Sequence, residues 1–178
     1  MKRCLILFVI FLVISCTVAP RYYLDISLKK PIDSNILRYT DNKIDIIFRM
    51  GEKQIAFDLQ NKTETGIRIN WDEVGYISPT GRTMRVIHSG IRLMDRNSPQ
   101  APTMVPPGSR VSDVIIPSEN IYFVSGRYGG WNELDLFPGN DKSIYKGAEF
   151  GLYFPLVMGD RREDYKFIFR VDEVRRSQ

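Results

Sequence analysis

The sequence predicts an all-β domain, an antiparallel β-sandwich with about seven to nine strands. Two observations lead to this prediction. Apolar and polar residues alternate with period two in many short segments from residue 44 onward, and turn residues separate these segments at short, regular intervals. Such alternation is typical of strands that pack one face inward and expose the other. No segment has the periodicity of a sustained helix.

The expected strands can be located one by one along the chain. They lie at residues 44–48, 55–59, 67–71, 74–77, 83–88, 110–116, 121–124, 149–157 and 165–174, and residues 22–28 alternate enough for a short edge strand. The segments at 149–157 and 165–174 predict a hairpin whose inward-facing side chains are Phe150, Leu152, Phe154, Phe167, Phe169 and Val171. The variable lengths of the connections favour a sandwich over a closed barrel.

Length and charge fit one folded domain. The 178 residues are 43% hydrophobic and 26% charged, which is ordinary for a globular protein. The formal charge of +4 falls to about +2 without Lys2 and Arg3, because 25 basic residues become 23 against 21 acidic ones. A nucleic-acid interface needs a concentrated positive surface, so this class of partner is not expected.

Residues 1–16 predict a secretory lipoprotein signal. Lys2 and Arg3 precede an apolar run that is shorter than the roughly 20 residues of a membrane-spanning helix. The run ends in Val13-Ile14-Ser15-Cys16, which resembles the bacterial lipobox. That motif implies cleavage between Ser15 and Cys16 and transfer of a diacylglyceryl group to the thiol of Cys16, followed by acylation of the new amine with a chain such as palmitate. The alternative is an uncleaved signal anchor.

The residues around Cys16 extend this expectation. Cys4 and Cys16 are the only cysteines, so removal of one and lipidation of the other leave no thiol for a disulfide, a metal or a nucleophile. In enteric bacteria, aspartate directly after the lipidated cysteine retains a lipoprotein in the inner membrane. This chain has Thr17 at that position, so the resemblance implies that the protein is anchored in the outer membrane and faces the periplasm. The expected organisation is a signal peptide at 1–15, lipidated cysteine and tether at 16–43, sandwich at 44–174 and tail at 175–178.

The order of the segments resembles a group of largely uncharacterised bacterial lipoproteins with immunoglobulin-like β-sandwich domains. The residues that carry the resemblance are Phe57–Thr63, Ile69–Asp72, Arg85–Gly90, Pro106–Ser109, Ile116–Ser118 and Leu152–Leu156. The resemblance covers residues 44–174. It implies an immunoglobulin-like sandwich and transfers no catalytic residue to this chain.

Catalytic and metal signatures are sparse. His88 is the single histidine and has no cysteine with which to share a zinc or copper ion, so we expect a structural role for it and no metal or cofactor. Ser89-Gly90 does not open a helix as a nucleophile elbow does, and Gly126–Gly130 lacks the spacing of a phosphate-binding loop. A surface calcium site near Asp141 and a pair of carboxylates from distant strands remain alternatives.

Three aromatic residues stand out as candidate partner contacts: Tyr128, Trp131 and Phe137, in a glycine-rich connection at 125–143. Exposed aromatic residues on loops are frequent contact anchors. The competing interpretation is that they fold back and plug the end of the sandwich. The proline-rich connection at 98–108 and an exposed sheet edge are two further candidate surfaces, whereas Trp71 is expected in the core.

These observations together predict a membrane-anchored, non-enzymatic binding or assembly module of the cell envelope, with an envelope protein as partner. The alternatives are an envelope enzyme, or a binder of small ligands or glycans, with its site in a loop at the end of a sheet. A narrower alternative is an accessory lipoprotein of a secretion or pilus machine.

Overall fold

A computed structural model describes residues 21–176 of the chain. The expected signal peptide, its cleavage site at Ser15 and Cys16, and the lipid on Cys16 lie outside the described residues. The described part is all-β, as predicted, and all of its strand pairs are antiparallel. None of its helices has the length and apolar character needed to cross a membrane.

The described residues form thirteen strands and four short 3₁₀ helices. The strands are β1 (Tyr22–Lys30), β2 (Arg38–Thr40), β3 (Ile44–Met50), β4 (Ile55–Asn61), β5 (Ile67–Ile69), β6 (Gly75–Ile77), β7 (Thr83–Ile87), β8 (Thr103–Val105), β9 (Arg110–Pro117), β10 (Ile121–Val124), β11 (Gly130–Glu133), β12 (Glu149–Met158) and β13 (Arg161–Arg176). The helices are η1 (Trp71–Glu73), η2 (Leu93–Asp95), η3 (Ser118–Asn120) and η4 (Ser143–Tyr145). This is more than the seven to nine strands expected.

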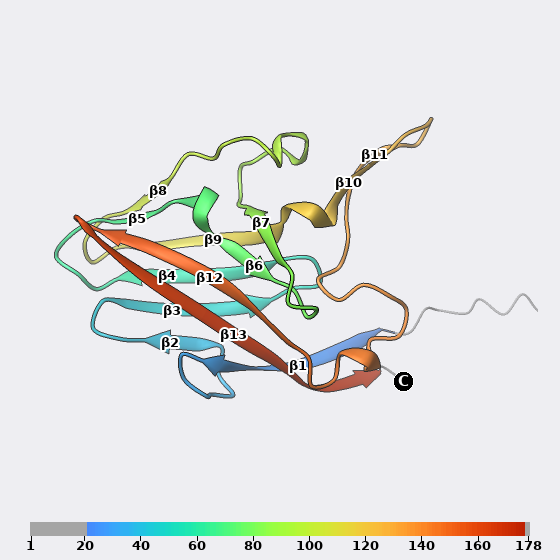
Figure 1. Ribbon diagram of the computed structural model, residues 1–178, viewed down its shortest axis with the longest axis horizontal. Helices are drawn as coiled ribbons and strands as arrows, with labels where there is room; N and C mark the ends of the chain where they lie inside the picture. The colour runs from blue at the N-terminus through green and yellow to red at the C-terminus, as the bar shows by residue number, and fades with distance from the viewer. Residues whose placement is uncertain (1–20, 177–178) are drawn as a thin grey trace, which may run out of the picture.

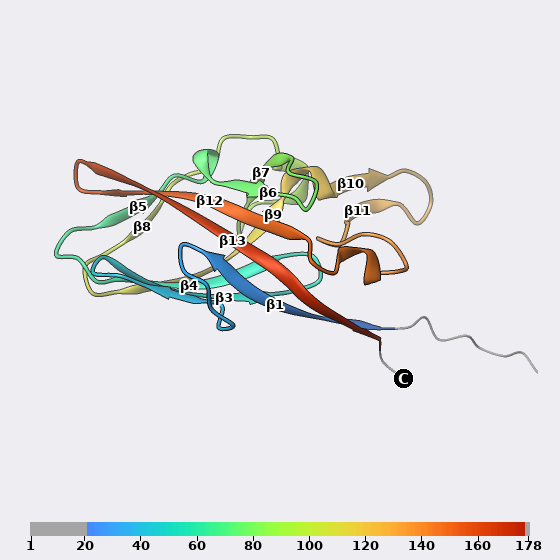
Figure 2. The ribbon, with the colours of Figure 1, turned by 60° about the horizontal axis from the view of Figure 1, so that its bottom comes forward.

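Eleven strands belong to one continuous sheet that folds over on itself (Figures 1 and 2). The strands follow the order β1-β13-β12-β6-β7-β9-β4-β3-β2, and β5 branches from β12 and pairs with β8. Figure 2 shows β12 and β6 in one layer and β3 and β4 in the other. β9 connects the layers, because it pairs with β4 along most of its length and with β7 at Ile116 and Pro117. β10 and β11 form a separate hairpin.

The core lies between the two layers and is built from alternate positions of the long strands. The fully or almost fully buried side chains include Ile55, Phe57, Leu59, Phe150, Leu152, Phe154, Phe167, Phe169 and Val171, so the inward faces predicted for the last hairpin are confirmed. Trp71 is fully buried and contacts Phe57 and Phe154, as predicted. Each such side chain stabilises the fold by about 1.5–3 kcal/mol.

The folded domain begins earlier than the boundary predicted at residue 44, and residues 22–43 are not a tether. β1 pairs with β13 along its length, and its residue Leu28 is fully buried. β2 pairs with β3, which brings the rest of this segment into the sheet. The physical reason is that β13 extends beyond β12 to Arg176, and β1 is the strand that pairs with this extension. The part of the predicted tether that the structure leaves undescribed is residues 16–20.

Strands β2, β8 and β11 were not expected, because each has only three or four residues and none of them lies in a longer segment of alternating or apolar residues. β8 lies inside the proline-rich connection at 98–108. It pairs only with β5, at the sheet margin, which agrees with the expectation that this segment stays out of a sheet interior.

Candidate functional site

The free edge of β1 is the first feature of the candidate site. β1 stands at one end of the strand order, so one side pairs with β13 while the other faces no strand of the described chain. On that outer side, the N–H of Leu28 donates to the carbonyl oxygen of Ser34 at 2.9 Å, and the N–H of Ser34 donates back to Leu28 at 2.8 Å. The edge is therefore covered at Leu28 and open toward Tyr22.

Strand geometry shows which backbone groups line the open part of this edge. Alternate residues of a strand direct their N–H and C=O groups to the same side. The register shift between Asp25 and Ile26 adds a residue to β13 and none to β1, so the alternation along β1 is kept. Ile26 and Leu24 thus direct their backbone groups outward, as Leu28 does, and present them to an incoming strand.

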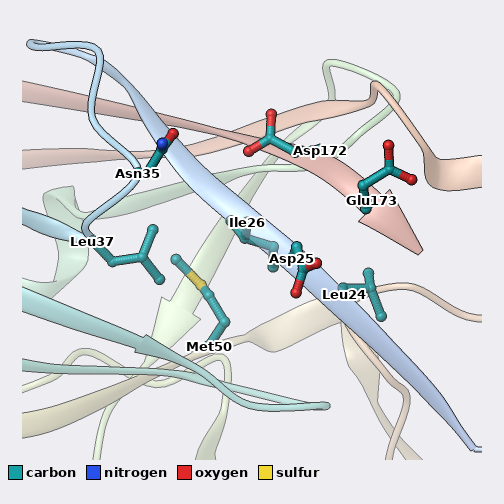
Figure 3. A pocket seen from close by; sticks show the side chains of 8 residues that line it. All are labelled: Leu24, Asp25, Ile26, Asn35, Leu37, Met50, Asp172 and Glu173. Carbon is teal, nitrogen blue, oxygen red and sulfur yellow. The ribbon is translucent and has the colours of Figure 1, made fainter. Parts of the chain in front are cut away.

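A hollow of about 690 Å³ lies against this edge (Figure 3). It is lined by Leu24, Asp25 and Ile26 of β1, by Asn35 and Leu37, by Met50 of β3, and by Asp172 and Glu173 of β13. Figure 3 shows Leu37 and Met50 across the hollow from Ile26. Leu24, Ile26, Leu37 and Met50 are partly buried against the core, so the hollow has an apolar floor and carboxylates at its rim.

A second hollow, of about 1360 Å³, adjoins the first and shares Leu24, Asp25, Ile26 and Met50 with it. We call the two hollows together the β1 groove. The second hollow adds Arg21, Tyr22, Tyr23, Gly51, Glu52, Asp135, Phe137, Gly139, Asn140, Lys142, Arg175 and Arg176. Some of these charges pair with one another: Arg175 with Asp25 at 2.6 Å, and Lys142 with Asp135 at 2.8 Å. The groove is therefore apolar at its floor and carries both signs of charge at its walls.

The three aromatic residues predicted as partner contacts lie in different environments. Tyr128 is at the tip of the β10–β11 hairpin with 92% of its surface exposed. Trp131, opposite Phe123 in β11, is half-buried and packs against a small cluster that contains Ile87 and Ile116. Phe137 has only 6% of its surface exposed and packs on Phe150, with ring centroids 5.1 Å apart.

The sequence left two interpretations of these residues open: exposed partner contacts, or side chains that fold back and plug the end of the sandwich. Tyr128 fits the first interpretation and Phe137 fits the second. Phe137 belongs to the main core and exposes only 6% of its surface, so it is not an exposed contact of the loop; the small part that remains accessible lines the second hollow of the β1 groove. The physical reason is that the chain turns back onto the sandwich after β11, where the N–H of Leu136 donates to the carbonyl oxygen of Glu52 at 2.8 Å.

Sequence analysis missed the exposed surface of β10. Tyr122, Phe123 and Val124 are all exposed, and only Ile121 of this strand is buried. An apolar run of four residues predicts a buried strand, and nothing in the sequence indicates that β10 pairs with β11 alone.

His88 lies in a well-defined polar environment at the end of β7. Its Nδ1 is 3.1 Å from Oδ2 of Asp113. The other oxygen of Asp113 accepts hydrogen bonds from the N–H groups of Ser89, at 2.9 Å, and Val114, at 2.7 Å. The carboxylate thus orients the imidazole while it closes the backbone of the turn. The described residues include no group of three or more side chains arranged to hold a metal ion.

Comparison with known proteins gives no match to any protein-family model, curated protein or solved structure. The geometry of the β1 groove and of the β10–β11 hairpin is thus the basis for a functional interpretation.

Proposed function

We propose that the chain is a lipid-anchored, non-enzymatic binding module of the bacterial cell envelope, and that it holds an extended segment of an envelope protein along the free edge of β1. The observation that supports this proposal is the coincidence of outward backbone groups at Leu24 and Ile26 with an apolar hollow beside them. An added strand uses both features, since its main chain gives affinity and its alternate side chains enter pockets.

The dimensions of the groove suit one strand. Neighbouring strands lie about 4.7–4.9 Å apart, and side chains alternate between the two faces of a strand. A segment paired with Leu24 and Ile26 directs every second side chain toward the floor between Leu37 and Met50. Its polar side chains then face solvent and the charged walls. The preferred occupant is an extended segment with alternating apolar residues.

The anchor is supported by the lipobox at Val13–Cys16. Cys16 precedes Arg21 by five residues, which reach at most about 18 Å when extended. A lipid on Cys16 therefore holds the Arg21 end of the β1 groove close to the membrane surface. In this proposal the groove works at the membrane, and Thr17 after the cysteine supports the outer membrane, with the domain in the periplasm.

The test compares the natively lipidated protein with a version whose signal is replaced by a secretory signal without a cysteine. Growing cells are labelled with palmitate, cross-linked, and the protein is captured and analysed by mass spectrometry. The proposal predicts palmitate on the native protein, none on the control, and cross-linked peptides of one envelope protein that join to groove residues. Absence of palmitate contradicts the anchor, and cross-links that avoid the groove contradict the binding site.

A further inference from the structure

The β10–β11 hairpin projects from the same end of the molecule at which β1 begins. Figures 1 and 2 agree in this: the hairpin, the start of β1 and the end of β13 lie at one end of the long axis, and β8 lies toward the other. The described chain enters its fold at this end, at Arg21. The hairpin and Arg21, the first described residue, therefore lie at the same end of the domain.

The surface of the hairpin is aromatic and carries positive charge. Phe123 is 58% exposed and Tyr128 is 92% exposed, and Tyr122 and Val124 are exposed beside them. The acidic residue of the hairpin is Glu133, at its base opposite Ile121, whereas Arg127 lies at the tip with its guanidinium 5.8 Å from the ring centre of Tyr128. Exposed apolar side chains that gather on a projection of this kind are typical of an interaction surface.

The hairpin is held against the rest of the domain through Trp131 of β11, which packs on the cluster that contains Ile87 and Ile116. Trp131 packs edge to face on Phe123, with ring centroids 5.3 Å apart, and the guanidinium of Arg96 lies 4.8 Å from its ring centre. The N–H of Leu134 donates to the carbonyl oxygen of Asn120 at 2.8 Å, which closes the base of the ribbon. The tip is thus presented in a defined direction relative to the start of β1.

We propose that the tip of the β10–β11 hairpin docks into the headgroup region of the same bilayer that holds the lipid anchor. The proposal rests on the proposed function in one respect, the lipid on Cys16. Tyrosine and tryptophan concentrate at membrane–water interfaces because their rings are apolar at one end and polar at the other. Arg127 adds attraction to anionic headgroups, and its aliphatic stem suits the boundary.

The docked hairpin orients the domain on the membrane, whereas the acyl chains hold the protein there. Two or three acyl chains already hold a lipoprotein firmly in the membrane. A second point of attachment at Tyr128 fixes the orientation of the domain relative to the membrane, which a lipid at one point does not. It thereby fixes the direction in which the β1 groove faces.

The test places a fluorescent reporter at Tyr128 of the full-length lipidated protein. Cys4 and Cys16 are the only cysteines, and the first is removed with the signal while the second is acylated, so Tyr128→Cys creates one free thiol. The matched control is Met104→Cys on β8, which is 59% exposed and lies at the other end of the molecule. Both variants are labelled with an environment-sensitive dye and reconstituted into vesicles of phosphatidylethanolamine and phosphatidylglycerol.

The proposal predicts that quenching of the dye at position 128 by iodide falls severalfold when the protein moves from detergent to vesicles, with a blue shift of its emission. The dye at position 104 is quenched equally in both. A smaller effect at position 128 in phosphatidylcholine vesicles is expected from Arg127.

Three results overturn the proposal, and they are distinguishable. If the protein does not sediment with the vesicles, the anchor fails and the docking fails with it. If it sediments but the dye at position 128 is quenched as in detergent, the docking alone is wrong. If the dye is shielded in native membranes and not in pure lipid vesicles, the hairpin binds a protein.

Discussion

The imidazole of His88 lies flat against the indole of Trp71, with ring centroids 4.2 Å apart and an angle of 4° between the ring planes. Trp71 in turn donates from Nε1 to Oγ1 of Thr103 at 2.9 Å. The stack joins the end of β7, the helix η1 and β8, which are distant in the sequence. The single histidine of the chain is therefore part of the packing of this corner.

This packing predicts a cost in stability for removal of the ring. We expect His88→Ala to lower the free energy of unfolding by about 1–3 kcal/mol, because it removes the stack on Trp71 and leaves the carboxylate of Asp113 without its side-chain partner. His88→Phe keeps the stack and is expected to lose less. Urea denaturation followed by tryptophan fluorescence, to which Trp71 and Trp131 both contribute, measures the two variants, and an unchanged midpoint for His88→Ala contradicts the structural role.

A second prediction concerns Asn61, which is fully buried at the end of β4. Its Nδ2 donates to the carbonyl oxygens of Thr65, at 2.7 Å, and Val105, at 3.0 Å, and its Oδ1 accepts from the N–H of Thr63 at 2.9 Å. We expect Asn61→Ala to cost about 2–3 kcal/mol, because it removes three hydrogen bonds made by a buried side chain, although the carbonyl oxygen of Thr65 keeps the bond from the hydroxyl of Thr63.

The control is Asn97→Ala at an exposed loop position, which is expected to change the free energy of unfolding by less than about 0.5 kcal/mol. Chemical denaturation of the two variants side by side gives the comparison. Equal effects of the two substitutions are incompatible with the role assigned to Asn61.

A third prediction uses two adjacent glycines of the hairpin. A Cβ atom at Gly129 would lie 2.2 Å from the carbonyl oxygen of Val124, whereas one at Gly130 meets nothing within 4 Å. We expect Gly129→Ala to distort the tip and speed amide hydrogen exchange in β10, with little change in the global unfolding transition, because the hairpin is a separate sheet. Gly130→Ala is expected to exchange like the wild type. Identical exchange in the two variants contradicts the described turn.

A fourth prediction follows from Asp41, which joins the start of β3 to β13. Burial raises the pKa of this carboxyl, but hydrogen bonds from the N–H groups of Ile44 and Lys43 and from the hydroxyls of Tyr165 and Tyr39 outweigh it and lower the pKa below its ordinary value. Ionised Asp41 therefore stabilises the fold at pH values above about 3.9, the pKa of this carboxyl in the unfolded chain. This stabilisation is lost as the pH falls through the lower pKa that the carboxyl has in the folded state.

The variant Asp41→Asn should accordingly be less stable than the wild type near neutral pH, by about 1–2 kcal/mol from the weakened hydrogen bonds. The difference should shrink between about pH 5 and pH 2, as the wild-type carboxyl takes up a proton. Urea titrations across this pH range measure it. A difference that stays constant in acid shows that ionised Asp41 does not stabilise the fold.

Much of the core could be predicted from the sequence because alternation fixes which side chains face inward. Phe150, Leu152 and Phe154 alternate with less apolar residues and all lie in the core, and Trp71 ends an alternating segment and is fully buried. The free edge of β1 was also foreseen as an edge strand at residues 22–28. In each case a local pattern was sufficient.

The candidate sites depended on relations between distant residues, and the sequence does not contain these. The β1 groove requires Met50 and Leu37 to lie opposite Ile26, which follows from the folding of the sheet and not from any local pattern. In the same way, Phe123 is exposed because the β10–β11 hairpin is a separate sheet that projects from the main one, so that no second layer of the described chain covers this side chain. Burial of Phe137 results from the return of the chain onto the sandwich after the hairpin.

The most direct test of the proposed strand addition is photo-cross-linking in living cells from position 23. Tyr23, on the open part of β1, is 58% exposed, and its replacement by benzoylphenylalanine preserves an aromatic side chain. Met104, equally exposed on β8, is the control position. The proposal predicts a cross-link from position 23 to one extended segment of an envelope protein and none to that protein from position 104. Equal products from both positions, or none from position 23 in a lipidated protein, would contradict it.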